Sequence, residues 1–399
     1  MTPVQNAFLT LLRISLGGND APPELTAEQW PSLFDLADAH KLLPMVFEAG
    51  YARISRDAPD LAAAAKRRVR NHVILQTLRT SEFLALYRAL EEAGATPLVV
   101  KGIVCRQLYP KPDHRPSSDE DVLIRPEQFP LCHDIMTRLG MGTNEPDPAA
   151  AYEVPYRKAG SPLYIELHKH LFPPESQAYG DLNSFFGNPF LNSTTLTVQD
   201  QQIRTMHPTD HMTYLLLHAF KHFLHSGFGI RQICDMLLFA HHHNDLIDWE
   251  RVRLSCRRIR AEKFAAAVFT IGVKHLGFAP VGGWETVSEL PLLEDILRAG
   301  IYGSSELSRQ HSSSVTLEAA ATRKPPQLGF LTAAFPSAKA LEGRYPWLKK
   351  QPYLLPIAWA GRIASYLRET KNRPDSSLAD ALKIGAERVK LLRQYDIVN

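Results

Sequence analysis

The 399-residue chain has few cysteines, and no two of them are close together in the sequence. Because it has no CxxC pair, the usual ligand spacing of a zinc ribbon is excluded and a disulfide framework is disfavoured. Such cysteine usage is typical of reduced thiols, so we expect a cytoplasmic protein with buried cysteine side chains. The four cysteines are Cys105, Cys132, Cys234 and Cys256.

Long hydrophobic runs are also missing. No stretch approaches the roughly 18 consecutive apolar residues of a membrane-spanning helix, so we expect no membrane partner. The first residues, MTPVQNAFLTLLRISLGG, contain no basic leader, and Arg13 interrupts their apolar positions. They therefore predict an amphipathic helix rather than a signal peptide.

The chain has little net charge of either sign. A formal charge of +3 does not by itself require a nucleic-acid partner. An apolar fraction of 45% and a charged fraction of 22% are typical of a globular protein, which excludes a disordered or fibrous class. A chain of this length exceeds the usual size of one hydrophobic core, so roughly two or three structural units are expected.

Hydrophobic periodicity divides the chain into four regions and predicts an α+β fold. Residues 1–94 and 206–303 have apolar residues at helical spacing, and both are predicted to be helical. Residues 95–205 mix short apolar runs with alternating segments, which predicts a small α+β unit. Residues 304–399 are expected to hold a linker followed by C-terminal helices.

Three short segments of the α+β unit are predicted to be strands. The first is the apolar run at 97–100. The second is 119–124, where period-2 alternation places Asp119 and Asp121 on one face and Glu120 on the other. The third is 163–171, where Ile165 and Leu167 face one side and Glu166 and His168 the other.

Carboxylates on neighbouring strands predict a cation site. Asp119, Asp121 and Glu166 would supply oxygen ligands, which Mg²⁺ prefers and Mn²⁺ also accepts. Such a site suits phosphoryl or nucleotidyl transfer, in which a metal neutralises charge on a triphosphate. Glu166 would complete the site or act as the base. His168, on the same face, is expected to position a phosphate or move a proton.

The order of these motifs resembles the uncharacterised nucleotidyltransferase family of the polymerase β-like superfamily. The resemblance rests on a core block followed by helical signals such as His218 with His222 and Arg231 with Asp235. The core block comprises Lys101-Gly102, Leu108-Tyr109-Pro110, Arg115, Asp119-x-Asp121, Leu139-Gly140 and Glu166-Leu167-His168.

This resemblance implies a mixed-sheet nucleotidyltransferase palm surrounded by helices, with Asp119, Asp121 and Glu166 as the metal-binding acids. A nucleoside triphosphate (NTP) would donate its nucleoside monophosphate (NMP) to an acceptor, with release of pyrophosphate. The acceptor would be a small molecule, a peptide, a protein side chain or an RNA end.

One departure from the superfamily concerns the Gly-Ser pair that cradles the triphosphate, because this chain has Lys101-Gly102 instead. Gly102 still allows close approach, and Lys101 supplies a charge for phosphate. Arg115, Ser117 and Ser118 are further candidates for binding phosphate oxygens. Glu120 also departs from the apolar residue usual between the two aspartates, which predicts weaker packing of the strand.

Two other functions remain open at this point. His211, His218, His222 and His225 share one helical face, and imidazoles at i and i+4 can bind the zinc of a metal hydrolase. No Glu follows His218, however, so we expect His218 and His222 to line the nucleotide cleft or pack in the core. A nucleotide-binding scaffold without turnover is the second alternative, suggested by the altered Lys101-Gly102 pair.

Overall fold

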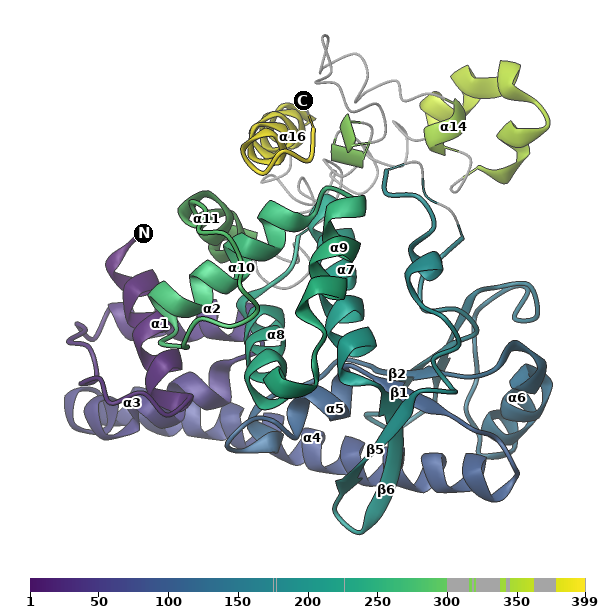
Figure 1. Cartoon of the computed structure of the whole chain (residues 1–399). Helices are drawn as coiled ribbons and strands as arrows, with labels where there is room; N and C mark the ends of the chain where they lie inside the picture. Colours follow the sequence, from purple (N-terminus) through teal and green to yellow (C-terminus); the bar gives the residue numbers. More distant parts are fainter. Residues whose placement is uncertain are drawn as a thin grey trace.

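The computed structural model confirms the expected α+β class. It describes residues 1–174, 176, 178–225, 227–299, 316–317, 319–320, 338–341, 345–361 and 378–398. Within these residues, one open six-stranded mixed sheet is surrounded by helices (Figure 1). Most of the linker expected after residue 303 lies outside the described residues.

Four helices precede the sheet: α1 (Pro3–Ser15), α2 (Gln29–Ala39), α3 (Leu43–Asp57) and α4 (Pro59–Glu92). The predicted N-terminal helix is confirmed as α1, which begins with a capping box between Thr2 and Gln5. α4 has 34 residues and is therefore about 50 Å long. Figure 1 shows α4 along the base of the molecule, with α3 beside one end and the sheet above the other.

The sheet has the strand order β3-β4-β2-β1-β6-β5. β1 pairs antiparallel with β2 and parallel with β6, β2 pairs parallel with β4, and the edge strands β3 and β5 pair antiparallel with their neighbours. The two central strands, β1 and β2, are buried along their whole length. The strands are β1 (Leu98–Val100), β2 (Glu120–Leu123), β3 (Glu153–Arg157), β4 (Tyr164–His168), β5 (Ser193–Val198) and β6 (Gln201–Met206).

The two faces of the sheet contact different parts of the molecule. Val122, Ile165 and Leu167 belong to a core shared with the second half of α4 and with α6 (Phe129–Arg138). The opposite face carries Asp121, Glu166 and His168, as the alternation of β2 and β4 requires. This face looks toward α7 (Pro208–His225), whose residues line the same pocket as these three side chains.

Helices after the sheet pack against the N-terminal helices in one large core, which includes Phe8, Trp30, Phe220 and Phe264. Of the region 206–303, the described residues 206–225 and 227–299 are mainly helical, as expected. The helices concerned are α7, α8 (Ile230–His242), α9 (Trp249–Arg258), α10 (Glu262–His275) and α11 (Leu290–Ala299). Short α5 (Gly102–Arg106) follows β1, and the last described helices are α14 (Ala338–Leu341) and α16 (Leu378–Gln394).

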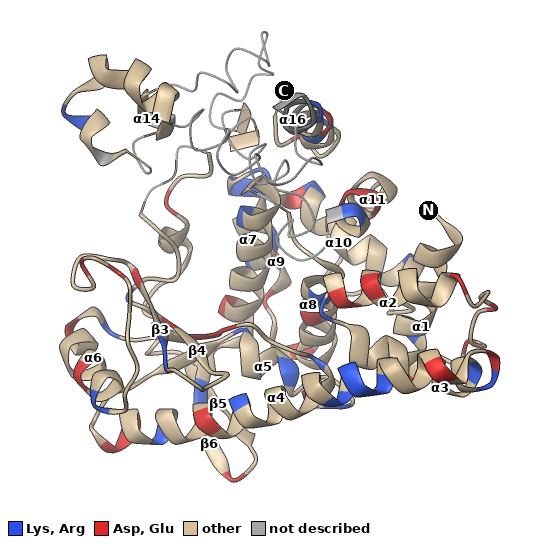
Figure 2. Ribbon diagram, turned by 180° about the vertical axis from the view of Figure 1, so that it is seen from behind, with Lys and Arg blue, Asp and Glu red and all other residues tan. Residues whose placement is uncertain are grey.

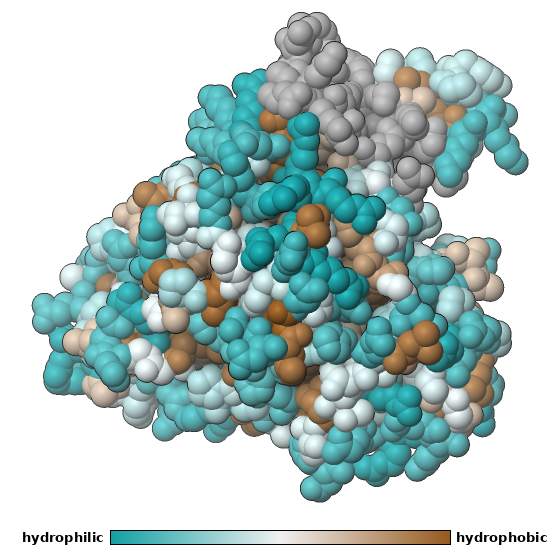
Figure 3. Space-filling model, viewed as in Figure 1, coloured by the Kyte–Doolittle hydropathy of each residue, from teal (hydrophilic) through white to brown (hydrophobic). Residues whose placement is uncertain are grey.

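The surface has charges of both signs and little continuous apolar area. Figure 2 shows basic residues in blue along the ribbon of α4, where Lys66, Arg67, Arg68 and Arg70 are exposed. Figure 3 shows a mainly hydrophilic face with scattered apolar patches. No helix among the described residues has the length and apolarity needed to cross a membrane.

Candidate active site

The Lys101-Gly102 pair forms a strained turn between β1 and α5. Both residues have positive φ, 49° at Lys101 and 37° at Gly102, and a lysine in this region of the Ramachandran plot is uncommon. His211 of α7 holds the turn, because its Nε2 accepts the Lys101 backbone N–H at 3.1 Å. Burial lowers the pKa of His211 to about 3, so the imidazole is neutral and can accept this bond.

Gly102 has a specific steric reason to be glycine. A Cβ at this position would overlap the carboxylate of Glu120, which lies directly under the turn. The same carboxylate accepts the Ile103 backbone N–H at 2.7 Å. Glycine at position 102 therefore allows a close approach to the backbone, as expected, but the approaching group is the Glu120 carboxylate of the same chain.

Glu120 belongs to a buried group that we call the support network: Glu120, Arg106, Ser117 and Gln76. Glu120 and Arg106 are both fully buried, and their side chains form an ion pair at 3.0 Å. The Ser117 hydroxyl donates to Glu120 at 2.9 Å, and Gln76 of α4 accepts the Ser117 backbone N–H at 2.7 Å. Glu120 is thus satisfied on the α4 side of β2, and the expectation that it weakens the strand finds no support in these contacts.

Asp121 lies on the other face of β2 and meets two side chains of β4. It is opposite Glu166 in the parallel register, and its Oδ1 is 3.1 Å from His168 Nε2. His168 Nε2 is also 3.8 Å from Glu166 Oε2. Among the described residues, Asp121, Glu166 and His168 form the one group of three potential metal ligands whose donor atoms all lie within 4.8 Å of one another.

These three side chains fit a divalent cation. Asp121 Oδ2 is buried and no described residue forms a hydrogen bond with it, whereas Oδ1 is 2.8 Å from Lys101 Nζ. A buried carboxylate oxygen without a partner is unfavourable unless something else binds it. Two carboxylates suit Mg²⁺, and the added imidazole suits Mn²⁺ equally well.

The charges around Asp121 are strongly coupled. Burial alone would raise the pKa of Asp121, but Lys101 and His168 hold it well below its usual range. Burial would likewise lower the pKa of His168, and the carboxylates of Asp121 and Glu166 instead raise it to about 9. Burial raises the pKa of Glu166. Without a bound cation, Lys101 and His168 therefore supply the positive charge that Asp121 requires.

The group opens into a cavity that we call the acidic pocket. Asp119, Asp121 and Glu166 all line it, so the three predicted acids share one cavity. Asp119 nevertheless lies outside the three-ligand group, and His168 takes its place there. Burial raises the pKa of Asp119. The other lining residues are Lys101, Glu153, His168, Leu171, Tyr214, His218, Lys221 and His222.

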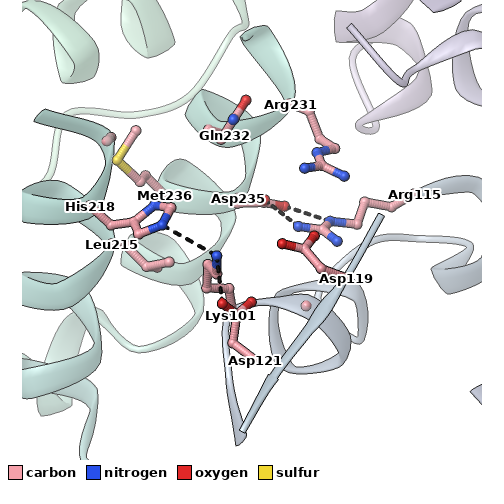
Figure 4. A pocket seen from close by; sticks show the side chains of 12 residues that line it. Lys101, Arg115, Asp119, Asp121, Leu215, His218, Arg231, Gln232, Asp235 and Met236 are labelled. Atoms are coloured by element: carbon pink, nitrogen blue, oxygen red, sulfur yellow. Dashed lines mark hydrogen bonds and ion pairs between the residues drawn. The ribbon is translucent and has the colours of Figure 1, made fainter. Parts of the chain in front are cut away.

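A second, smaller cavity adjoins the first, and we call it the arginine pocket. It shares Lys101, Asp119, Asp121 and His218 with the acidic pocket and is completed mainly by Arg115 and by α8 residues. Figure 4 shows Lys101 between Asp121 and His218, with Arg115, Asp119 and Arg231 facing one another nearby. The remaining lining residues are Gly102, Leu215, Ala219, Gln232, Asp235 and Met236.

The two predicted serines lie differently from the other phosphate-binding candidates. Lys101, Gly102 and Arg115 line the arginine pocket. Ser117 is buried in the support network and lines neither pocket, whereas Ser118 is exposed. Only the first three candidates therefore border the cavity beside the acids.

The histidines of α7 contact Lys101 and each other. His218 Nε2 is 3.3 Å from Lys101 Nζ and 3.2 Å from His222 Nε2. Burial and the positive charge of Lys101 and Lys221 lower the pKa of both imidazoles well below the usual value. Their placement along the cleft agrees with the expectation, and within the described chain no third potential ligand joins them in a metal-binding group.

Comparison with known families agrees with this geometry. The family model for uncharacterised nucleotidyltransferases matches residues 26–277, which is more than half of the chain. The chain therefore belongs to the uncharacterised nucleotidyltransferase family, as the motifs suggested, and is a nucleotidyltransferase enzyme. The match extends from just before α2 to the end of α10 and includes both pockets. Neither the curated proteins nor the solved structures gave a match.

Proposed function

We propose that this protein transfers a nucleoside monophosphate from an NTP to an acceptor in a metal-dependent reaction that releases pyrophosphate. One observation carries the proposal: the donor atoms of Asp121, Glu166 and His168 lie within 4.8 Å of one another, and Asp121 Oδ2 is buried with no hydrogen-bond partner among the described residues. This group lies beside a pocket lined by Lys101 and two arginines, which suits a polyphosphate.

The metal-binding roles follow from the contacts. Asp121 and Glu166 would hold Mg²⁺ or Mn²⁺, with His168 as a further ligand or a support for Asp121. Asp119 borders both pockets and would bind a second cation or orient the first. When bound, the divalent ion would neutralise negative charge on the triphosphate.

The transfer step requires attack by an acceptor oxygen on the α-phosphorus. The bond between the α-phosphorus and its bridging oxygen to the β-phosphorus breaks, and pyrophosphate leaves with that bond pair. Glu166 is the more accessible acid, with 23% of its side chain exposed against 1% for Asp121. We therefore assign it the contact with the acceptor, whose proton it would take. Lys101, Arg115 and the backbone at Gly102 would hold phosphate oxygens.

The two alternatives have separate tests. A hydrolase built on His218 and His222 requires tightly bound zinc after purification without added metal. A scaffold without turnover requires ordinary NTP affinity with no pyrophosphate release across a broad panel of acceptors. The hydrolase alternative would not use the carboxylate group around Asp121.

The cysteines support a cytoplasmic location as part of this proposal. All four are free and buried, with no disulfide, which suits a reducing compartment. Cell fractionation with an antibody against the protein tests the location, and recovery outside the cytoplasmic fraction would contradict it.

The transfer activity can be tested by incubating the protein with each NTP, Mg²⁺ or Mn²⁺ and host-cell extract, and by following the added mass on acceptors. Asp121→Asn should lose transfer while remaining folded, because it removes a metal-binding charge with little change of shape. Asp134→Asn, on the exposed side of α6, is the matched control and should label normally. Equal labelling by all three proteins would refute the mechanism.

A further inference from the structure

Two buried arginines face the arginine pocket from different parts of the chain. Arg115 is in the loop before β2 and is 2% exposed, and Arg231 is in the first turn of α8 and is 3% exposed. Burying a guanidinium is unfavourable unless a carboxylate or another anion compensates its charge. The partners of each arginine therefore show whether its positive charge is compensated within the protein.

Arg115 has a full carboxylate partner. Its Nε and Nη2 donate to the two oxygens of Asp235 at 3.0 and 2.5 Å, in the forked geometry that arginine favours. The Tyr109 hydroxyl donates to the same carboxylate at 2.8 Å. Arg115 is thus held in place by Asp235, a residue 120 positions away in the chain.

Arg231 has no such partner in the part of the chain that the structure describes. Its spacing from Asp235 would allow an ion pair within α8, but Asp235 is taken by Arg115. Arg231 Nη1 instead donates to the Pro116 carbonyl at 2.5 Å, which leaves its charge uncompensated by an ion pair. Of the other acids lining the pocket, Asp121 is already paired with Lys101, and Asp119 attracts Arg231 electrostatically without forming an ion pair with it among the described residues.

Unpartnered donors point to a missing ligand. Arg115 Nη1 and Arg231 Nε are both buried, with no hydrogen-bond partner among the described residues. Figure 4 shows the two guanidinium groups facing the same space beside Asp119. One ligand that satisfies both donors needs at least two acceptor oxygens, and the positive charge of the two arginines favours an anion.

On the basis of the function proposed above, we infer that the arginine pocket binds the β- and γ-phosphates of the NTP, with Arg231 as a phosphate-binding residue. Lys101, Asp119 and Asp121 border both pockets, so a triphosphate whose α-phosphorus lies at the acidic pocket can extend into the arginine pocket. Asp235 is a positioning residue, because it acts by orienting Arg115.

Inorganic tripolyphosphate is the direct probe, since it carries the proposed contacts without base or sugar. Isothermal titration with Mg²⁺ present should show that Arg231→Met binds tripolyphosphate about 10- to 100-fold more weakly than the native chain. Affinity for an NMP should be unchanged, because an NMP lacks the distal phosphates. Arg231→Lys should be intermediate, and Arg138→Gln, on the exposed surface of α6, should behave as native.

Thermal unfolding separates this role from a structural one. If Arg231 is kept for a ligand, Arg231→Met should leave the Tm of the ligand-free protein unchanged or raise it, because an uncompensated buried charge is removed. Tripolyphosphate should then raise the Tm of the native chain but not of the variant. A lower ligand-free Tm together with a native tripolyphosphate response would overturn the inference.

The positioning role of Asp235 has its own readout. Asp235→Asn should weaken tripolyphosphate binding in the native chain but add little in an Arg115→Gln background, because it acts through Arg115. Equal losses in the two backgrounds would contradict that role.

These results are distinguishable from failure of the transfer proposal. If no acceptor is ever labelled but Arg231→Met still loses tripolyphosphate binding, the phosphate site stands and the transfer reaction falls. If the native chain does not bind tripolyphosphate, or binds NTP as tightly in Arg231→Met as in the native chain, the phosphate site falls. Equal NTP affinity in Arg231→Met and the native chain is also the outcome expected if the arginine pocket held a phosphate of the acceptor instead.

Discussion

Glu120 and Asp121 are adjacent buried acids on opposite faces of β2, and their surroundings differ completely. Glu120 is 0% exposed and has an arginine, a serine hydroxyl and a backbone N–H as partners. Asp121 is 1% exposed and belongs to the group with Glu166 and His168, yet one of its oxygens has no hydrogen-bond partner in the part of the chain that the structure describes. Burial alone therefore does not identify the functional acid, whereas an unsatisfied oxygen beside a cavity does.

The two acids are connected through the turn that precedes α5. Glu120 supports Gly102 and Ile103 from below, and Lys101 of the same turn reaches Asp121 from above. The support network thus fixes the backbone that carries Lys101. Changes on the two faces of β2 should consequently affect stability and activity in different proportions.

The largest expected effect is the loss of transfer in Asp121→Asn. We expect the transfer rate to fall by about 10³-fold or more, because the cation site loses its buried charge. The Tm should also fall, since Lys101 and His168 stay buried but lose their carboxylate partner. Transfer rate and Tm are measured on the same preparation. An Asp121→Asn variant that retains its transfer rate but loses stability would show that Asp121 is a structural acid and not the functional one.

Glu120→Gln should affect stability more than transfer activity. The free energy of unfolding should fall by about 3 kcal/mol, because Arg106 is left buried without its anionic partner. Transfer per folded molecule should remain closer to native than in Asp121→Asn. Urea unfolding monitored by circular dichroism gives the first quantity, and an unchanged midpoint would show that the support network contributes no stability.

Gly102→Ala tests the connection between the two faces. We expect a loss of about 2 kcal/mol or more in unfolding free energy, because the added methyl overlaps Glu120 and the turn has positive φ. Gly94→Ala is the matched control, since Gly94 also has positive φ but open space around its Cβ position. It should lose only about 1 kcal/mol. Equal losses would mean that contact with Glu120 is unimportant.

The smallest expected effect is a change of pH dependence in His211→Gln. The pKa of His211 is lowered from 6.5 to about 3, so the unfolded chain binds one more proton between these values. Stability therefore rises with pH across this window, by about 1.4 kcal/mol per pH unit from this residue. Unfolding in urea from pH 4 to 6 should give a shallower slope for the variant, and identical slopes would show that His211 does not stay neutral.

Much of the site could be predicted from local pattern. Period-2 alternation placed Asp119 and Asp121 on one face, and Glu166 with His168 on one face of β4, because strand geometry depends only on neighbouring residues. Helical spacing likewise predicted α7 and its row of histidines. The edge strand β3 and the β5–β6 hairpin were not predicted; β5 is rich in threonine and largely exposed, with little hydrophobic signal.

Long-range partners could not be predicted in this way. The i, i+4 spacing of Arg231 and Asp235 would allow an ion pair within α8, but Asp235 pairs with Arg115 instead. Ser117 had the right residue type for a phosphate ligand, yet it bonds to Glu120. His211 appeared as one of four histidines, and its bond to the Lys101 backbone depends on how α7 packs against β1. Such contacts arise from tertiary packing, which residue spacing does not report.

The most direct test of the central claim is a Mn²⁺ titration followed by electron paramagnetic resonance, on the native chain, Asp121→Asn and Glu120→Gln with an NTP analogue that cannot be hydrolysed. If Asp121 is the buried oxygen donor for the divalent ion, the native chain and folded Glu120→Gln should bind Mn²⁺ tightly, and Asp121→Asn should lose that binding. Native Mn²⁺ affinity in Asp121→Asn would contradict the account.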